Sequence, residues 1–227
     1  MIRKILLRLQ PLLRAVGKIH LPGTKKKVTG EDYVKGRAIW KNGTIFASRY
    51  NWEPSNFLIS GYWKHIAMYI INPNDETGLY DYVVEAVDPI VKKTNMIDFM
   101  RKDGLIAFEP VLTKDGAEIS DALKQSIMNK AAEYSKEEVG IPYDYTLDWQ
   151  GNTRSAQDIK NWKVQREFYC SELVFWSYKR ACVDYEVDWD FHLRPRMGLL
   201  TVTPQDFANT AYAGKSNRLI WKDSNQK

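Results

Sequence analysis

A cysteine at the boundary between a polar stretch and an apolar helix constrains this chain more than any other feature. Cys170 follows Phe168 and Tyr169, and apolar residues then recur at helical spacing from Leu173 to Ala181. This pattern predicts that Cys170 lies at or just before the first turn of a helix. The helix dipole and the unpaired backbone N–H groups favour a thiolate there, and the same N–H groups can hold an oxyanion. The competing interpretation is a small, buried cysteine without chemistry.

A predicted hairpin upstream carries a histidine and a carboxylate. Two strand-like segments flank the polar turn 72–78. If Ile71 pairs with Asp81, His65 and Glu85 become diagonal neighbours on one face, about 7–8 Å apart, whereas a slip of one residue would put them on opposite faces. A carboxylate beside an imidazole fixes its tautomer and raises its pKa, which suits a general base. The alternative is a structural histidine with a solvent-facing glutamate.

The rest of the chain reads as short strands and turns with helices between them. The expected strands cover residues 37–40, 44–47, 61–71, 79–87, 105–110, 199–204 and 218–221, and the other expected helices cover residues 118–139 and 204–208. Two aromatic loops, residues 48–61 and 184–198, are expected to wall a substrate cleft. Trp52 in the first loop and Tyr169 beside the cysteine are predicted to contact substrate.

The positive charge of the chain is concentrated at its beginning. The first 41 residues carry a net charge of +9, which leaves −4 for the rest. Residues 2–19 have apolar side chains on one helical face and only basic charges, a pattern typical of a basic amphipathic helix, interrupted at Pro11. Such a helix can contact anionic lipid or dock on the protein's own core. Basic residues within the apolar region argue against a secretory signal.

We therefore expect an N-terminal helix and linker, residues 1–33, and one main domain, residues 34–227. The chain has no apolar stretch long enough to cross a membrane, which predicts a cytoplasmic or peripherally membrane-associated protein. An acidic main domain argues against nucleic acid as a partner. Cys182 is predicted to be structural, and His20 and His192 to be ordinary surface residues. No Cys/His pair has metal-ligand spacing, so no metal or other cofactor is expected.

Five segments occur in the order seen in one known family. They cover residues 63–69, 84–86, 142–145, 169–174 and 203–206. Through them, residues 34–222 resemble the circularly permuted papain-like amidases, the YaeF/YiiX-like branch of the NlpC superfamily. Papain-like enzymes usually place the cysteine before the histidine, whereas here the cysteine helix comes last.

The resemblance implies a permuted papain-like (NlpC-type) α+β fold, with a small antiparallel sheet packed on the cysteine-bearing helix. By position, Cys170 would be the nucleophile, His65 the general base and Glu85 the acid that orients the histidine, with Tyr143 near the substrate cleft. Two residues depart from the family pattern. Lys64 replaces a small polar residue and is expected to disfavour protonated histidine, and Thr44 stands where an aspartate is frequent.

The implied activity is that of a thiol hydrolase, an amidase or peptidase that acts on a peptide, a cell-wall peptide or a lipid amide. The thiolate would attack a carbonyl, backbone N–H groups would hold the oxyanion, and water would resolve the thioester. Transfer to another acceptor would make the protein an acyltransferase. The alternative from a different class is a non-catalytic lipid- or partner-binding module on the same fold.

Overall fold

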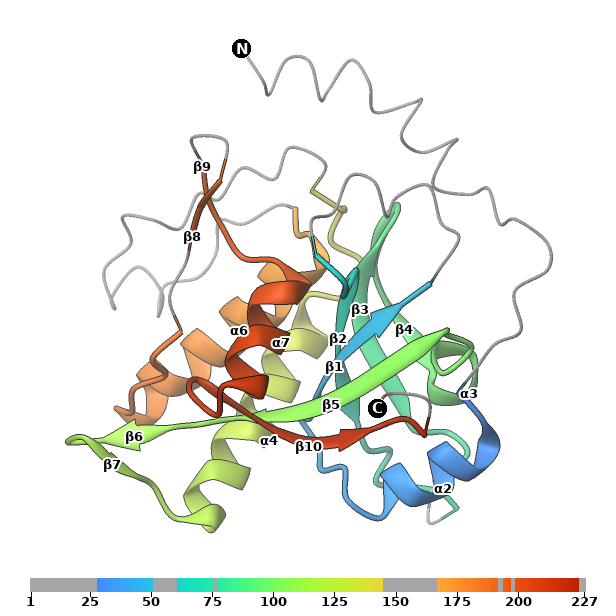
Figure 1. The fold of residues 1–227 in the computed structure, drawn as a ribbon, viewed down its shortest axis with the longest axis horizontal. Coiled ribbons are helices and arrows are strands. Elements are labelled where there is room, and N and C mark those ends of the chain that lie inside the picture. The colour runs from blue at the N-terminus through green and yellow to red at the C-terminus, as the bar shows by residue number, and fades with distance from the viewer. Residues whose placement is uncertain are drawn as a thin grey trace.

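The computed structural model describes residues 28–50, 61–75, 77–144, 167–191, 194–196 and 199–224, with side chains left out for the residues described between 192 and 200. Its central element is a six-stranded antiparallel sheet in the order β10-β5-β1-β2-β3-β4 (Figure 1). These strands are β1 (Ile45–Arg49), β2 (His65–Ile70), β3 (Tyr82–Val87), β4 (Ile90–Asn95), β5 (Gly104–Pro110) and β10 (Asn217–Lys222). The sheet and the helices confirm the predicted α+β fold.

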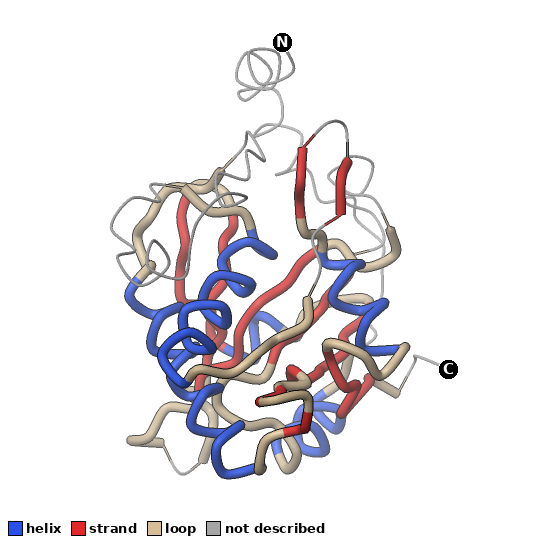
Figure 2. Tube along the Cα trace, turned by 90° about the vertical axis from the view of Figure 1, so that its left-hand side faces the viewer, coloured by secondary structure: helices blue, strands red, loops and turns tan. Residues whose placement is uncertain are grey.

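Helices cover both faces of this sheet. The helices are α2 (Gly30–Arg37), α3 (Met96–Phe99), α4 (Asp121–Glu137), α6 (Cys170–Tyr185) and α7 (Pro204–Tyr212). Two small strand pairs stand apart from the sheet, namely β6 (Thr113–Lys114) with β7 (Ala117–Glu118) and β8 (Arg194–Arg196) with β9 (Leu199–Thr201). In Figure 2, β8 and β9 lie side by side beyond the start of α7. The described helices therefore form two layers, one on each side of the sheet.

Alternating side chains of the strands build two separate hydrophobic cores. In β2, Ile66, Met68 and Ile70 pack with residues of α4, α6 and α7 on one face. Ala67 and Tyr69 pack on the other face, against aromatic residues around α2 and α3. This division follows from the two-residue period of a β-strand. Because His65 is next to Ile66 in the strand, its side chain lies on the other face of the sheet, away from α6.

The register of the β2–β3 hairpin is the predicted one. Met68 pairs with Val84, and Ile70 pairs with Tyr82. The same register, extended by one residue, puts Ile71 opposite Asp81, as expected. Because a one-residue slip would exchange the two cores, burial on both faces specifies this register strongly.

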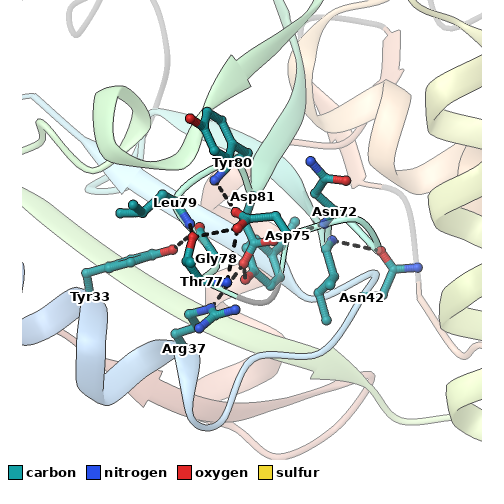
Figure 3. Close-up of polar contacts among 12 residues, drawn as sticks. Tyr33, Arg37, Asn42, Asn72, Asp75, Thr77, Gly78, Leu79, Tyr80 and Asp81 are labelled. Atoms are coloured by element: carbon teal, nitrogen blue, oxygen red, sulfur yellow. Dashed lines mark hydrogen bonds and ion pairs between the residues drawn. The ribbon is translucent and has the colours of Figure 1, made fainter.

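Asp81 holds the closed end of this hairpin (Figure 3). Its carboxylate is fully buried and accepts hydrogen bonds from the Tyr69 hydroxyl at 2.5 Å and the Asn72 backbone N–H at 2.9 Å. The Arg37 guanidinium of α2 pairs with the same carboxylate at 3.3 Å. Beside this cluster lies a cavity of about 350 Å³ that Tyr33 also lines, at the end of the sheet away from His65.

The predicted strand over residues 37–40 is wrong, because this stretch ends helix α2. Thr29 and Asp32 form a reciprocal capping box at its start, a local signal that outweighs the strand-like alternation. Trp40 then turns into the core beneath the helix. Strand β1 pairs instead with β2 and β5. Helix α2 also runs across the boundary expected between residues 33 and 34.

Most other predicted elements are found, with changes at their ends. Helix α4 starts after the Ser120 cap, and α6 begins at Cys170 as expected. Helix α7 extends further than residues 204–208, and its Thr203 capping box shortens the strand predicted over residues 199–204. The amphipathic segment 2–19, His20, Trp52 and His192 lie outside the described residues.

Candidate active site

Cys170 is the first residue of α6 and is only 4% exposed. Its sulfur forms a hydrogen bond with the His65 side chain and accepts hydrogen bonds from the backbone N–H groups of Ile66 and Ser171. Burial by itself would raise the pKa of Cys170, but these donors and the positive imidazolium lower it below its usual value. The local structure therefore favours the thiolate.

His65 lies between the cysteine and a carboxylate. Its Nε2 is 2.7 Å from Glu85 Oε2, which leaves Nδ1 as the ring nitrogen for the sulfur. The two side chains are 16% and 5% exposed. Burial lowers the pKa of His65, but its hydrogen bonds with Cys170 and Glu85 raise it to about 9. The two anionic partners therefore set the direction of this shift, and an unfavourable effect of Lys64 on protonated His65 stays a prediction.

The thiol reaches the imidazole where the pairing of β2 with β3 stops. The N–H of Tyr69 donates to the Thr44 carbonyl on the β1 side, so the N–H of Ile66, an odd number of residues away, faces the β3 side. The described β2–β3 pairs begin only at Met68 with Val84. This leaves the Ile66 N–H for the sulfur, and it lets a residue of α6 meet a histidine that belongs to the opposite face.

Glu85 is held in place by a second neighbour. The Thr94 hydroxyl donates a hydrogen bond of 2.5 Å to Glu85 Oε1. Burial raises the pKa of Glu85, but the hydrogen bond with His65, the charges of His65 and Lys102 and the Thr94 bond lower it to about 2. The carboxylate is therefore ionised at neutral pH and faces the imidazolium.

Lys102 brings a positive charge to the far side of this cluster. Its side chain is only 7% exposed, and its Nζ lies 4.0 Å from the ring centre of Tyr50 and 5.0 Å from that of Phe99. The Phe99 ring in turn packs near the His65 ring, with 6.3 Å between the two ring centres. The site thus alternates negative and positive groups from Cys170 through His65 and Glu85 to Lys102.

Sequence reasoning missed Thr94 and Lys102. Thr94 could have been found by extending the hairpin register to β4, where Lys92 pairs with Glu85 and Thr94 is the diagonal neighbour. Lys102 follows the short helix α3. No strand pairing or helical spacing in the sequence connects it to Glu85, so the sequence did not predict this neighbour.

The two tyrosines predicted near the substrate take different positions. Tyr143 is half-buried, and its pKa is raised by burial and by the negative charge of Cys170, so it lies within electrostatic range of the thiolate. Tyr169 is only 3% exposed, and its hydroxyl lies 3.0 Å from Thr201 Oγ1. This contact ties the residue before Cys170 to strand β9 and gives Tyr169 a packing role. Substrate contact by Tyr169 stays a prediction.

Two further features were sought in the part of the chain that the structure covers. No group of three or more histidine, cysteine, aspartate or glutamate residues that could hold a metal ion occurs among these residues. Nor does any described helix have the length and apolar character needed to cross a membrane.

A cysteine at the start of a helix, facing a histidine and a carboxylate on an antiparallel sheet, defines the papain-like class of thiol hydrolases. The order is permuted, because the histidine and the acid precede the cysteine. The family model of the permuted papain-like amidase enzymes, YaeF/YiiX, C92 family, matches residues 40–211, and the chain belongs to this family. A search of curated proteins found no match. Family membership identifies the protein in general terms as an amidase of the cysteine peptidase type.

Proposed function

We propose that Cys170, His65 and Glu85 form a catalytic triad that cleaves amide bonds through a thioester. The observation that carries this proposal is the continuous row of contacts from the Cys170 sulfur through the His65 ring to Glu85. The lowered pKa of Cys170 and the raised pKa of His65 support an ion pair of thiolate and imidazolium, the reactive form of a thiol hydrolase.

In the first step the Cys170 thiolate attacks the amide carbonyl, and the carbonyl oxygen becomes an oxyanion. The Cys170 backbone N–H, at the start of α6, and a second donor stabilise this oxyanion, at about 3 kcal/mol for each donor. His65 then gives its proton to the leaving amine, and the C–N bond breaks. A thioester with Cys170 remains.

In the second step His65 accepts a proton from water as the water attacks the thioester. The acid product leaves, and the thiolate and imidazolium form again. If an alcohol or amine replaces water, the same step transfers the acyl group. Glu85 keeps the imidazole oriented and stabilises its positive charge throughout.

The substrate classes that fit this chemistry are a peptide, a cell-wall peptide and a lipid amide. We propose that Tyr143 lines a cleft at Cys170, which the effect of the Cys170 charge on the Tyr143 pKa supports. We propose that Trp52 completes the cleft wall. We further propose that residues 2–19 bring the enzyme to anionic membranes, which liposome binding by the full chain and by a variant lacking these residues tests.

The rate of Cys170 alkylation by iodoacetamide as a function of pH tests the triad. Cys182 is the internal reference, because burial raises its pKa to about 12. We expect fast labelling of Cys170 that persists below about pH 7 and slows strongly in His65→Ala. Labelling that rises only near about pH 8.5 in both proteins would contradict the triad and favour the non-catalytic binding module.

Turnover provides the second readout. Once alkylation identifies the reactive thiol, amide substrates of the three classes are compared in the wild type and in Cys170→Ala. Full turnover by Cys170→Ala would exclude the mechanism, and loss of turnover with retained folding would support it.

A further inference from the structure

Beside the triad, the last residue of β1 is an arginine that pairs with no carboxylate among the residues that the structure describes. Resting on the proposed function, we propose that Arg49 and Tyr62 form a subsite for an anionic oxygen group of the substrate, a carboxylate or a phosphate. The guanidinium carbon of Arg49 lies 3.9 Å from the centre of the Tyr62 ring. The stacked ring fixes the plane of the guanidinium, whose fork of N–H donors matches such groups.

Arg49 differs from the other arginines whose side chains are described. Each of the others pairs with a carboxylate, as Arg37 does with Asp81, Arg101 with Asp98, Arg180 with Glu137 and Glu138, and Arg218 with Glu118. Arg49 has no ion pair within the described residues, and its Nε is buried without an acceptor. Removing a guanidinium N–H from water without an acceptor costs free energy, which an anionic ligand would offset.

The sheet register places this arginine next to the general base. Ser48, one residue before Arg49, is the direct partner of His65 on the neighbouring strand. Successive Cα atoms are about 3.8 Å apart, and opposed Cα atoms about 4.5–5.5 Å apart, so the backbones of Arg49 and His65 are close neighbours. Alternation along β1 puts the Arg49 side chain on the face of Ile45 and Ala47, which is the face that α6 covers.

A lysine strengthens the positive potential at this place. Lys64 precedes His65, and its pKa is lowered by burial and by the charge of Arg49. Two positive groups therefore lie close together at the catalytic end of the sheet, although residues 42–227 as a whole are acidic. An anionic substrate group bound here would lie near the Cys170 sulfur.

The Tyr62 side of the subsite is held by α7. Gln205 Oε1 accepts hydrogen bonds from the backbone N–H groups of Tyr62 at 2.6 Å and Trp63 at 3.1 Å. The Tyr62 side chain itself remains 46% exposed, so a ligand can reach the stacked pair. The subsite is thus built before the ligand arrives, which reduces the entropy lost on binding.

Two alkylating reagents of similar size test the subsite at the thiol. Iodoacetate is anionic and iodoacetamide is neutral, so the ratio of their rates at Cys170 reports the local positive potential. We expect Arg49→Gln to lower this ratio about threefold to tenfold, Arg49→Lys to lower it less, and the control Arg101→Gln to leave it unchanged. An unchanged ratio in Arg49→Gln would overturn the proposal.

A second readout does not depend on the thiol. Acetate or inorganic phosphate, added at constant ionic strength, is expected to raise the Tm of the wild type and of Arg101→Gln but not of Arg49→Gln. A shift with acetate alone indicates a carboxylate substrate, and a shift with phosphate alone indicates a phosphate ester. If Cys170 is unreactive but the shift depends on Arg49, the triad fails and the subsite stands. If Cys170 is reactive but neither readout depends on Arg49, the subsite alone fails.

Discussion

Thr94 donates a hydrogen bond of 2.5 Å to Oε1 of Glu85, while Oε2 of the same carboxylate lies 2.7 Å from Nε2 of His65. Each carboxylate oxygen therefore has its own partner, and the carboxylate plane is fixed. Thr94 acts through Glu85 and is a positioning residue. The proposed triad therefore also depends on strand β4, which carries Thr94 but none of the three triad residues.

Replacing Thr94 with valine removes this donor and keeps the shape of the side chain. We expect the pKa of Glu85 to rise, because one of the bonds that stabilise its charge is lost, and Cys170 alkylation near about pH 6 to slow about fivefold to tenfold. The measurement is the pH profile of iodoacetamide labelling. Thr94→Ser should restore the wild-type profile, and Thr113→Val on β6 should not change it. A wild-type profile in Thr94→Val would contradict the positioning role.

The lowered pKa of Glu85 predicts that the folded protein loses stability in acid. Its pKa is about 2 in the folded state and about 4.5 ordinarily, so the unfolded state binds more protons between these values. The stabilisation from this group is present above about pH 4.5 and is lost as the pH falls toward about 2, at most about 3 kcal/mol. Urea unfolding at pH 5 and pH 3 should show a smaller fall for Glu85→Gln than for the wild type. Equal falls in both would refute this, and the exposed Glu118→Gln is the control.

The hairpin is expected to lose most stability when the buried carboxylate of Asp81 is changed. Asp81→Asn weakens the buried pair with Arg37 and replaces one acceptor oxygen, and we expect it to lower the free energy of unfolding by about 3 kcal/mol. The matched control is Asp98→Asn, which removes an exposed pair with Arg101 and should change it by less than about 1 kcal/mol. Urea denaturation of the two variants compares them directly. Similar small losses in both would show that the Asp81 cluster contributes little.

Gly61 tests the close approach of the segment before β2 to α7. Its φ is +97°, and a Cβ there would lie 2.5 Å from Gln205 Cβ. Gly116 also has a positive φ, +80°, but a Cβ there would meet nothing within 4 Å. Both Gly→Ala changes carry backbone strain of about 1 kcal/mol, and Gly61→Ala should cost clearly more because Gln205 must move. Equal losses of unfolding free energy would mean that Gln205 adjusts without cost.

The sequence alone determined the start of α6 and the register of the β2–β3 hairpin. Both depend on short-range patterns. At Cys170 a polar stretch changes to apolar residues at helical spacing. In the hairpin, the alternation of side chains puts His65 and Glu85 on one face only when Ile71 lies opposite Asp81. The resemblance of five segments then predicted the permuted family to which the chain belongs. Local pattern failed at residues 37–40, where the Thr29 capping box starts a helix.

Only the tertiary structure decided which groups surround the predicted triad. Thr94, Lys102 and Arg49 come from β4, from the segment after α3 and from the end of β1, and no periodicity links them to Cys170. Thr94 reaches Glu85 through the pairing of β4 with β3. The start of α6 reaches His65 where the pairing of β2 with β3 stops at Met68 and Val84. The sequence specifies each strand through its own alternation, but the electrostatic environment of a buried site arises from packing between elements, which local alternation does not encode.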